Sequence, residues 1–375
     1  MTDQDLLYNM ALTRLIGFNC QVTVQLYRTL GGGRAVYEHR HDLRDVVPEC
    51  SPRLAAMLQQ WDVPLARAEQ ELQFTKRHHI RVLCLDQDDY PLRLSKSVDA
   101  PVVLYYMGTA DLNTQRIVSI VGTRHATTYG QDLICRFVND LHKRFPQLLV
   151  VSGLAYGVDI CAHRQALTEG LPTVGVLAHG LDELYPPRHR ETAAQMVNQG
   201  GLLTEYMTNT KADKLNFVKR NRIVAGMSDA TVLVESAARG GGLITCRIAR
   251  DYGHQVMAFP GMVGAPYSEG CNNLIRDNGA HLITCADDFV AAMGWQSDEE
   301  RQEAQRRGIE RNLFPALADD EKQAVATLDE CGDMQLNMLS VKTNIAIGSL
   351  TALLFQLEMK GIVKPLAGGS YHLLK

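Results

Sequence analysis

The sequence of 375 residues lacks several features that would place it in a familiar class. Its nine cysteines include no C-x-x-C pair, and the two closest, Cys271 and Cys285, are 14 positions apart. Neither a zinc site nor a thioredoxin-like site is therefore expected, and scattered cysteines without a disulfide framework are typical of a reducing compartment. No apolar run approaches the length that spans a bilayer, and the acidic start, residues 1–5, does not resemble a signal peptide. We expect a cytoplasmic protein with no membrane partner.

The motifs of several large enzyme classes are also missing. The sequence contains no G-x-x-x-x-G-K-[ST] phosphate loop, no G-x-S-x-G nucleophile elbow and no H-E-x-x-H metal site. The first candidate turn between a strand and a helix, residues 122–126, lacks the G-x-G-x-x-G of dinucleotide-binding proteins. We therefore predict that the protein is not an enzyme and has no catalytic residues, no bound metal and no cofactor.

An excess of basic residues, which is usual in nucleic-acid-binding proteins, is absent as well. The formal net charge is −4, and residues 1–75 and 310–375 each contribute −2 of it. Residues 76–309 are balanced, with 25 basic and 25 acidic side chains. A nucleic-acid contact would therefore be local and would depend on a few Arg and Lys side chains and on backbone N–H groups. The acidic ends favour protein partners.

The pattern of the chain indicates several domains, with 46% apolar and 21% charged residues as in ordinary globular proteins. Residues 1–77 carry apolar side chains at helical spacing, which predicts a small helical domain. Residues 78–295 alternate short β-rich runs with helical patterns, which predicts an α/β fold with a doubly wound, mostly parallel sheet. Residues 296–310, rich in Glu, Gln and Arg, indicate a linker. Residues 311–375 hold three helical patterns and a β-hairpin, typical of a winged-helix domain.

The positions of the strands are predicted by apolar runs that suit burial on both faces of a sheet. After two lead-in strands at 80–85 and 102–106, the strands are expected at 117–121, 148–151, 173–177, 202–205, 230–234, 255–259 and 281–284. The main helices are expected at 129–144, 158–169, 189–198, 212–225 and 243–252.

Ligands of open α/β sheets bind beyond the carboxyl ends of the strands, so the residues that follow the strands are candidates for a site. Glycines there let backbone N–H groups approach an anion, helix N-termini add partial positive charge, and Arg can hold a phosphate through two hydrogen bonds. Several phosphate-sized sites along one edge suit a polyanion better than a single nucleotide. The candidate DNA- and phosphate-binding residues are Gly122, Thr123, Arg124, Ser152, Gly153, Ala155, Phe217, Lys219, Arg220, Asn221, Arg222, Gly240, Gly241, Gly242 and Asn272.

Each candidate has a structural alternative. A glycine after a strand is often only a tight turn, and Arg220 and Arg222 could lie on a solvated helix face. Asp159 and His163 are four residues apart on one helix face and could form an acid–base or metal pair. We favour the structural alternative for this pair, in which Asp159 caps the helix and His163 is a hydrogen-bond partner.

Together these segments resemble the DNA-processing protein A family, also called Smf. The resemblance is dense over residues 78–295 and looser over the flanking domains. The motifs that carry it are VSIVGTR at 118–124, SGLAYGVD at 152–159, RNRIVAG at 220–226, GLIT at 242–245, FPG at 259–261 and GCNNLI at 270–275.

The resemblance implies an extended Rossmann fold that binds single-stranded DNA, dimerises and loads the RecA recombinase onto incoming strands during natural transformation. It places a phosphate contact at Gly122, Thr123 and Arg124 and a basic element at residues 217–222, where Val218 replaces the usual proline. A further phosphate loop of the family corresponds to residues 240–243, without its usual hydroxyl.

Two alternatives remain open. A nucleotide hydrolase of the lysine-decarboxylase-like (LOG) group would need P-G-G-x-G-T-x-x-E, but residues 239–247 end on Arg247 and supply no glutamate. A regulatory adaptor could bind a competence regulator through the C-terminal domain. Its helix 345–357 is apolar and has no Lys or Arg before Lys360, which suits a protein contact better than a DNA groove. The N-terminal domain loosely resembles a sterile-alpha-motif or helix-hairpin-helix unit.

Overall fold

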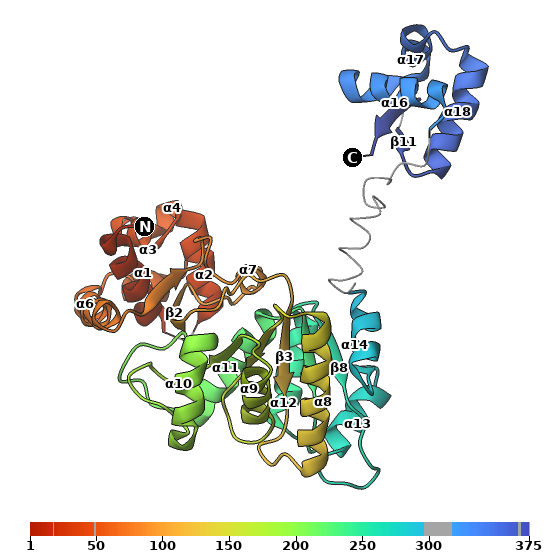
Figure 1. Cartoon of the computed structure of the whole chain (residues 1–375). Helices are drawn as coiled ribbons and strands as arrows, with labels where there is room; N and C mark the ends of the chain where they lie inside the picture. Colours follow the sequence, from red (N-terminus) through yellow and green to blue (C-terminus); the bar gives the residue numbers. More distant parts are fainter. Residues whose placement is uncertain (18, 49, 296–316, 367–368, 375) are drawn as a thin grey trace. The chain divides into compact units, whose positions relative to one another are not determined.

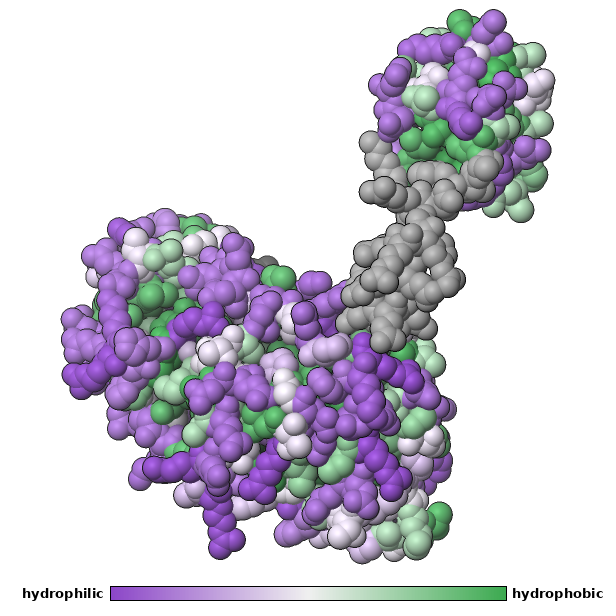
Figure 2. All heavy atoms as spheres, in the orientation of Figure 1, coloured by the Kyte–Doolittle hydropathy of each residue, from purple (hydrophilic) through white to green (hydrophobic). Residues whose placement is uncertain are grey.

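The computed structural model describes residues 1–17, 19–48, 50–295, 317–366 and 369–374. The chain divides into two compact units, Met1–Trp295 and Gln296–Lys375. The predicted linker, residues 296–310, lies outside the described residues. On the face of the first unit that Figure 2 shows, hydrophilic side chains predominate and apolar side chains are visible between them.

A nine-stranded sheet forms the centre of the first unit, with the strand order β1-β2-β6-β5-β4-β3-β7-β8-β9. The strands from β6 to β9 in this order are parallel, whereas β1 pairs antiparallel with β2 and β2 antiparallel with β6. Across the sheet, the strand numbers fall from β6 to β3 and then rise from β7 to β9, so the strand order reverses between β3 and β7. The strands are β1 (Arg81–Cys84), β2 (Val103–Gly108), β3 (Ile117–Val121), β4 (Leu149–Ser152), β5 (Thr173–Val176), β6 (Gly201–Thr204), β7 (Ala230–Leu233), β8 (Gln255–Ala258) and β9 (His281–Leu282).

Helices cover both faces of this sheet (Figure 1). Because side chains alternate along a strand, Val118 and Ile120 of β3 pack into one apolar core, and Ile117 and Val121 into the other. One face carries α8 (Thr128–Arg144), α9 (Val158–Thr168), α10 (Arg190–Gln199) and α14 (Ala286–Met293), and the other α11 (Lys214–Gly226), α12 (Gly241–Asp251) and α13 (Glu269–Arg276). The predicted α/β, doubly wound, mostly parallel sheet is confirmed.

The N-terminal helices share an apolar core with β1 and β2. The first helix starts at a capping box formed by Thr2 and Asp5, and the second ends at Gly31 in the left-handed conformation. These helices belong to the same compact unit as the sheet, and the predicted domain boundary after residue 77 stays a prediction. The elements before β2 are α1 (Asp3–Ile16), α2 (Cys20–Leu30), α3 (Gly33–Glu38), α4 (Leu43–Val46), α5 (Pro52–Met57), α6 (Asp62–Arg77) and α7 (Leu92–Ser95).

A buried polar network joins α6 to the segment that follows β6. The carboxylate of Glu71 accepts hydrogen bonds from the backbone N–H of Thr208 at 3.0 Å and from its hydroxyl at 2.6 Å. Arg67 donates to Glu71 at 2.8 Å and to the carbonyl oxygen of Thr208 at 2.7 Å. Every member of this network has partners, so it fixes the segment against the N-terminal helices.

The described part of the second unit contains three helices and a three-stranded antiparallel sheet. Leu328, Leu339, Leu350 and Leu354 are central to its own apolar core. These elements agree with the predicted three helices and hairpin, and the winged-helix assignment stays an interpretation. The elements are α16 (Asp319–Cys331), β10 (Met334–Gln335), α17 (Leu336–Thr343), α18 (Ile347–Met359), β11 (Val363–Leu366) and β12 (Ser370–Leu373), with the strand order β10-β12-β11.

Within the described ranges, no single helix has both the length and the apolar composition to cross a membrane. The bent pair α17 and α18 meets the criteria of length and composition only when its two helices are taken together.

Removing the Glu71 carboxylate should destabilise the first unit. The Glu71→Ala substitution leaves the N–H and hydroxyl of the buried Thr208 without their acceptor and removes the ion-pair partner of the half-buried Arg67, and breaking such a pair costs about 3–5 kcal/mol. Urea unfolding followed by fluorescence measures the change in the free energy of unfolding. The matched control is Glu69→Ala on the exposed face of the same helix, which should change little. Equal effects of the two substitutions would show that the network does not hold the helices.

Candidate functional site

A wide hollow lies where the strand order reverses, beyond the carboxyl ends of β3, β4 and β7. This switch-point cavity has a volume of about 740 Å³. It is lined by the loops at 121–125, 153–159 and 237–245 and by one face of α11. In open α/β sheets a crevice forms at such a point because neighbouring loops leave in opposite directions.

Glycines allow the loops of this cavity to approach one another. A Cβ on Gly122 would lie 2.6 Å from Cγ2 of Val158, and one on Gly242 would lie 2.7 Å from a methyl carbon of Leu233. Gly157 has a φ of +76°, and a Cβ there would lie 2.2 Å from the carbonyl oxygen of Thr123. Larger residues at these three positions would push the loops apart.

Hydrogen bonds fix the loop that follows β3. The N–H of Thr123 donates to the carbonyl oxygen of Glu235 at 2.7 Å, and the N–H of Val158 donates to Thr123 at 3.1 Å. The carboxylate of Glu235 accepts from the N–H of Thr127 at 2.8 Å and from its hydroxyl at 2.6 Å. Glu235 is buried and engaged in this way, so it positions the loop.

Eleven of the fifteen predicted residues come together around the switch-point cavity. They are Gly122, Thr123, Arg124, Gly153, Ala155, Phe217, Arg220, Asn221, Gly240, Gly241 and Gly242. Arg124 is exposed, and its guanidinium carbon lies 5.1 Å from the centre of the Phe217 ring.

Arg220 is buried at the floor of the cavity. One of its nitrogens donates to the carbonyl oxygen of Val176, and its guanidinium lies against Gly153, where a Cβ would be 2.1 Å from Nη1. Burial lowers the pKa of Arg220, and the negative charge of Asp159 opposes this effect. The solvated-face alternative is therefore wrong for Arg220.

Two predicted residues on α11 face elsewhere. Lys219 and Arg222 line a separate hollow of about 250 Å³, together with residues at the start of α2. The reason is helical spacing. Positions 219 and 222 lie on the opposite side of α11 from positions 217, 220 and 224, which line the switch-point cavity. Arg222 is buried and donates to Glu205 at 2.6 Å and to Sγ of Cys20 at 2.9 Å. Burial alone would lower the pKa of Arg222, but the charge of Glu205 raises it.

Two further predicted residues have structural partners and do not line the cavity. The hydroxyl of Ser152, fully buried, donates to the carbonyl oxygen of Ile120 at 2.6 Å. The side-chain amide of Asn272 pairs with both the N–H and the carbonyl group of Gly261 at 3.0 Å. Ser152 joins β4 to β3, and Asn272 closes a loop.

Asp159 and His163 each have a hydrogen-bond partner outside the pair, and the structural interpretation of the pair stays a prediction. The helix α9 begins after Gly157, and Asp159 lies within its first turn and accepts from the N–H of Ala155 at 3.3 Å. Burial raises the pKa of Asp159, and the charge of Arg220 opposes this effect. His163 is fully buried with Nδ1 2.7 Å from the hydroxyl of Thr173, and burial lowers its pKa to about 3.

Several residues at the cavity escaped the sequence analysis. Lys214 and Arg239 add positive charge to its lining, and Tyr185 and Tyr267 add aromatic rings. The ring of Tyr185 lies 5.7 Å from Phe217. Helical spacing could have found Lys214, three residues before Phe217, whereas the tyrosines are in loops whose sequence carries no such signal. Among the described residues, no cluster of three or more His, Cys, Asp or Glu side chains could hold a metal ion.

This fold and site define a Rossmann-type protein with a positively lined cavity at the switch point of its sheet. Comparison with known families is in agreement, because the family model of DNA recombination-mediator protein A matches residues 81–294. The chain belongs to this family, and the predicted family resemblance is confirmed.

Relatives of known name match over most of the chain. Protein Smf of Synechocystis is 31% identical over 331 residues, which cover 80% of this chain and 82% of the relative. DNA processing protein DprA of Streptococcus pneumoniae is 37% identical over 204 residues, which cover 54% of this chain and 71% of the relative.

Solved structures of two DNA processing A proteins are similar to this chain. The X-ray structure of DNA processing protein A from Streptococcus pneumoniae matches with a TM-score of 0.64 and 31% identity over 76% of this chain and 97% of that one. The structure of DNA processing protein A from Helicobacter pylori matches with a TM-score of 0.52 and 27% identity, over 57% of this chain and 95% of that one. The Helicobacter pylori structure concerns a single-stranded DNA binding mode of that protein.

The buried His163 should make the stability of the first unit depend on pH. Thr173 donates its hydroxyl hydrogen to Val150, so His163 donates from Nδ1, and Nε2 has no partner among the described residues. Because the folded-state pKa, about 3, lies below the ordinary value, the unfolded state binds the proton first as pH falls. The stability contributed by neutral His163 is therefore complete above pH ~6.5 and decreases by about 1.4 kcal/mol per pH unit below it.

Urea unfolding between pH ~7.5 and ~5 measures this dependence, a range in which histidines titrate more than carboxyl groups. The His163→Asn variant keeps a hydrogen-bond donor for Thr173, and its free energy of unfolding should depend less steeply on pH. The control is His41→Asn at an exposed position, which should keep the native slope. A slope unchanged by His163→Asn would contradict the assignment.

Proposed function

We propose that this protein binds single-stranded DNA in the switch-point cavity without catalysis, and that it loads RecA onto the strand during natural transformation. The observation that carries the proposal is the lining of this cavity. Glycine-rich loops, helix starts and cationic side chains from distant parts of the sequence converge there. Membership of a family of DNA recombination mediators supports the same function.

The charge around the cavity favours a polyanion. Its lining includes four cationic side chains, those of Arg124, Lys214, Arg220 and Arg239. Of the two acidic side chains, Asp159 is buried, and Asp213 accepts from two N–H groups at the start of α11. The excess of positive charge is local, so we propose a short footprint on DNA despite the net charge of −4.

Aromatic side chains at the cavity favour single-stranded over double-stranded DNA. Phe217, Tyr185 and Tyr267 lie beside the cationic groups, and Tyr185 is 41% exposed. Unpaired bases stack on such rings at about 1–3 kcal/mol each, and they do so with little dependence on sequence. In a duplex the bases are already stacked and paired, so this contribution is lost.

Hydrolysis of nucleotides has less support. The stretch 239–247 supplies no glutamate at the position the LOG group requires, and Arg247 stands there. The glutamate nearest in sequence to this loop, Glu235, is held by Thr127. We therefore propose a binding role for the same cavity.

Arg124 and Arg222 should respond differently to substitution. The Arg124→Ala variant should bind an oligothymidylate roughly tenfold or more weakly at low salt, because a charged phosphate contact is lost. Its log–log salt slope should be less steep by about 0.7. The Arg222→Ala variant should instead lower the free energy of unfolding by about 3–5 kcal/mol, because the largely buried Glu205 loses its partner.

Fluorescence anisotropy and urea unfolding measure the two effects. The matched control for Arg124 is Arg136→Ala, at an exposed position on α8, which should leave both properties unchanged. Oligothymidylate affinity that Arg124→Ala does not alter would rule out the cavity as the DNA site.

The RecA-loading role predicts an effect on filament assembly. On single-stranded DNA coated with a single-strand-binding protein, adding this chain should shorten the lag before RecA assembles. The Arg124→Ala variant should lose the effect in proportion to its weaker DNA binding. An unchanged lag with the native chain would contradict the loading role and leave DNA binding standing.

Three further features stay predictions. These are the formation of a homodimer, the cytoplasmic location and the binding of a competence regulator to the C-terminal unit. The exposed side chains of Phe355 and Met359 on α18 favour a protein contact at that unit.

A further inference from the structure

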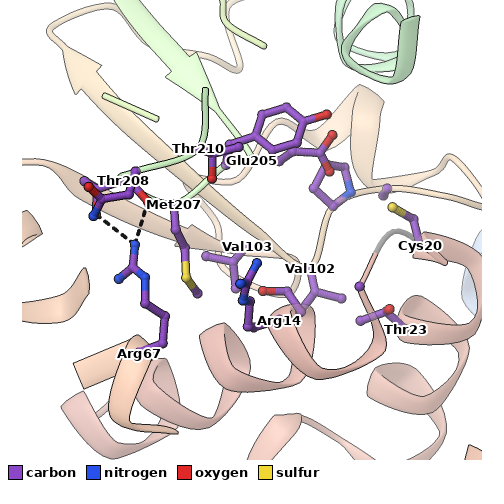
Figure 3. Close-up of a pocket in the computed structure, with 16 residues that line it drawn as sticks. Arg14, Cys20, Thr23, Arg67, Val102, Val103, Glu205, Met207, Thr208 and Thr210 are labelled. Carbon is purple, nitrogen blue, oxygen red and sulfur yellow. Dashed lines mark hydrogen bonds between the residues drawn. The ribbon is translucent and has the colours of Figure 1, made fainter. Parts of the chain in front are cut away.

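A second cavity, of about 180 Å³, lies between the N-terminal helices and the sheet (Figure 3). This N-terminal cavity is bounded by α1, α2 and α6, by the lead-in to β2 and by the segment 205–210 that follows β6. It shares no lining residue with the switch-point cavity. The proposed DNA-binding function therefore leaves it unexplained.

The walls of this cavity are apolar on one side and polar on the other. Ala100, Pro101, Val102, Val103 and Met207 supply the apolar surface. The polar residues of the lining include Thr13, Thr23 and Thr210. The network of Arg67 and Thr208 with Glu71 fixes one wall, as the dashed lines of Figure 3 show in part. A wall fixed in this way suits a preformed ligand site.

The uncompensated charge of the lining is positive. Arg67 is paired with Glu71, and Glu205 is paired with Arg222. Arg14 is exposed and has no ion-pair or hydrogen-bond partner within the described part of the chain. Figure 3 shows Arg14 rising from α1 between Met207 and Val102. An anionic group beside the apolar wall would give Arg14 a partner.

The volume limits the size of the ligand. A dry protein cavity of about 150 Å³ is known to hold benzene, so about 180 Å³ accommodates a body of six to eight non-hydrogen atoms. A nucleotide is too large for this space. A doubly charged phosphate is also disfavoured, because one unpaired cation faces it and the carboxylate of Glu205 lines the same cavity.

We propose that the N-terminal cavity binds a small monocarboxylate with an apolar body of about six carbons. Its carboxylate would pair with Arg14, and its hydrocarbon part would lie against Val102, Val103 and Met207. This site goes beyond the proposed DNA-binding function and does not depend on it.

Isothermal titration of the full chain with three probes tests the proposal. Sodium hexanoate should bind saturably with a Kd of about 1 mM or tighter. Hexylammonium, which has the same number of carbon atoms and the opposite charge, and inorganic phosphate should not bind measurably under the same conditions. The comparison of hexanoate with hexylammonium needs no variant, so it stands even if a substitution impairs folding.

Two substitutions locate the site. Arg14→Gln should weaken hexanoate binding about tenfold or more, because a hydrogen bond between charged groups is lost. Arg53→Gln, at an exposed position on α5 outside the cavity, should leave the affinity unchanged. The absence of saturable hexanoate binding, equal binding of hexylammonium, or equal affinities of the Arg14→Gln and native chains would each overturn the proposal.

Discussion

Two buried arginines on α11 point to opposite sides of this helix, and the arrangement of the first unit depends on them. Arg220 lies under the loop at Gly153 and brings a fixed positive charge to the floor of the switch-point cavity. Arg222 is paired with Glu205 on the other side and contacts Cys20 at the start of α2. One helix therefore joins the candidate DNA site to the N-terminal helices.

The local concentration of charge explains how an acidic chain can belong to a family of DNA recombination mediators. Formal charge counts every Arg equally, but Arg222 is neutralised by its carboxylate partner and Arg124 is free to meet a phosphate. The start of α12 at Gly241 adds a partial positive charge that formal charge does not count.

Most strands of the sheet could be predicted from the sequence. The direction in which each side chain of the helices points could not. Buried parallel strands are continuous apolar runs, so β3 was predicted at its observed bounds. The helices α13 and α14, eight residues each, are too short for a clear period and were missed. Motifs also do not show which way a side chain points, so Arg222 was grouped with Arg220, and Ser152 was taken for a ligand contact.

Hydrogen–deuterium exchange of the full chain, with and without an oligothymidylate, shows directly whether DNA occupies the switch-point cavity. With DNA bound there, exchange should be slower in the loops at 122–127, 153–159 and 239–245 and at the start of α11. Exchange in the C-terminal unit, residues 317–374, should not change. Protection confined to that unit, or to the N-terminal helices, would contradict the assignment of the switch-point cavity as the DNA site.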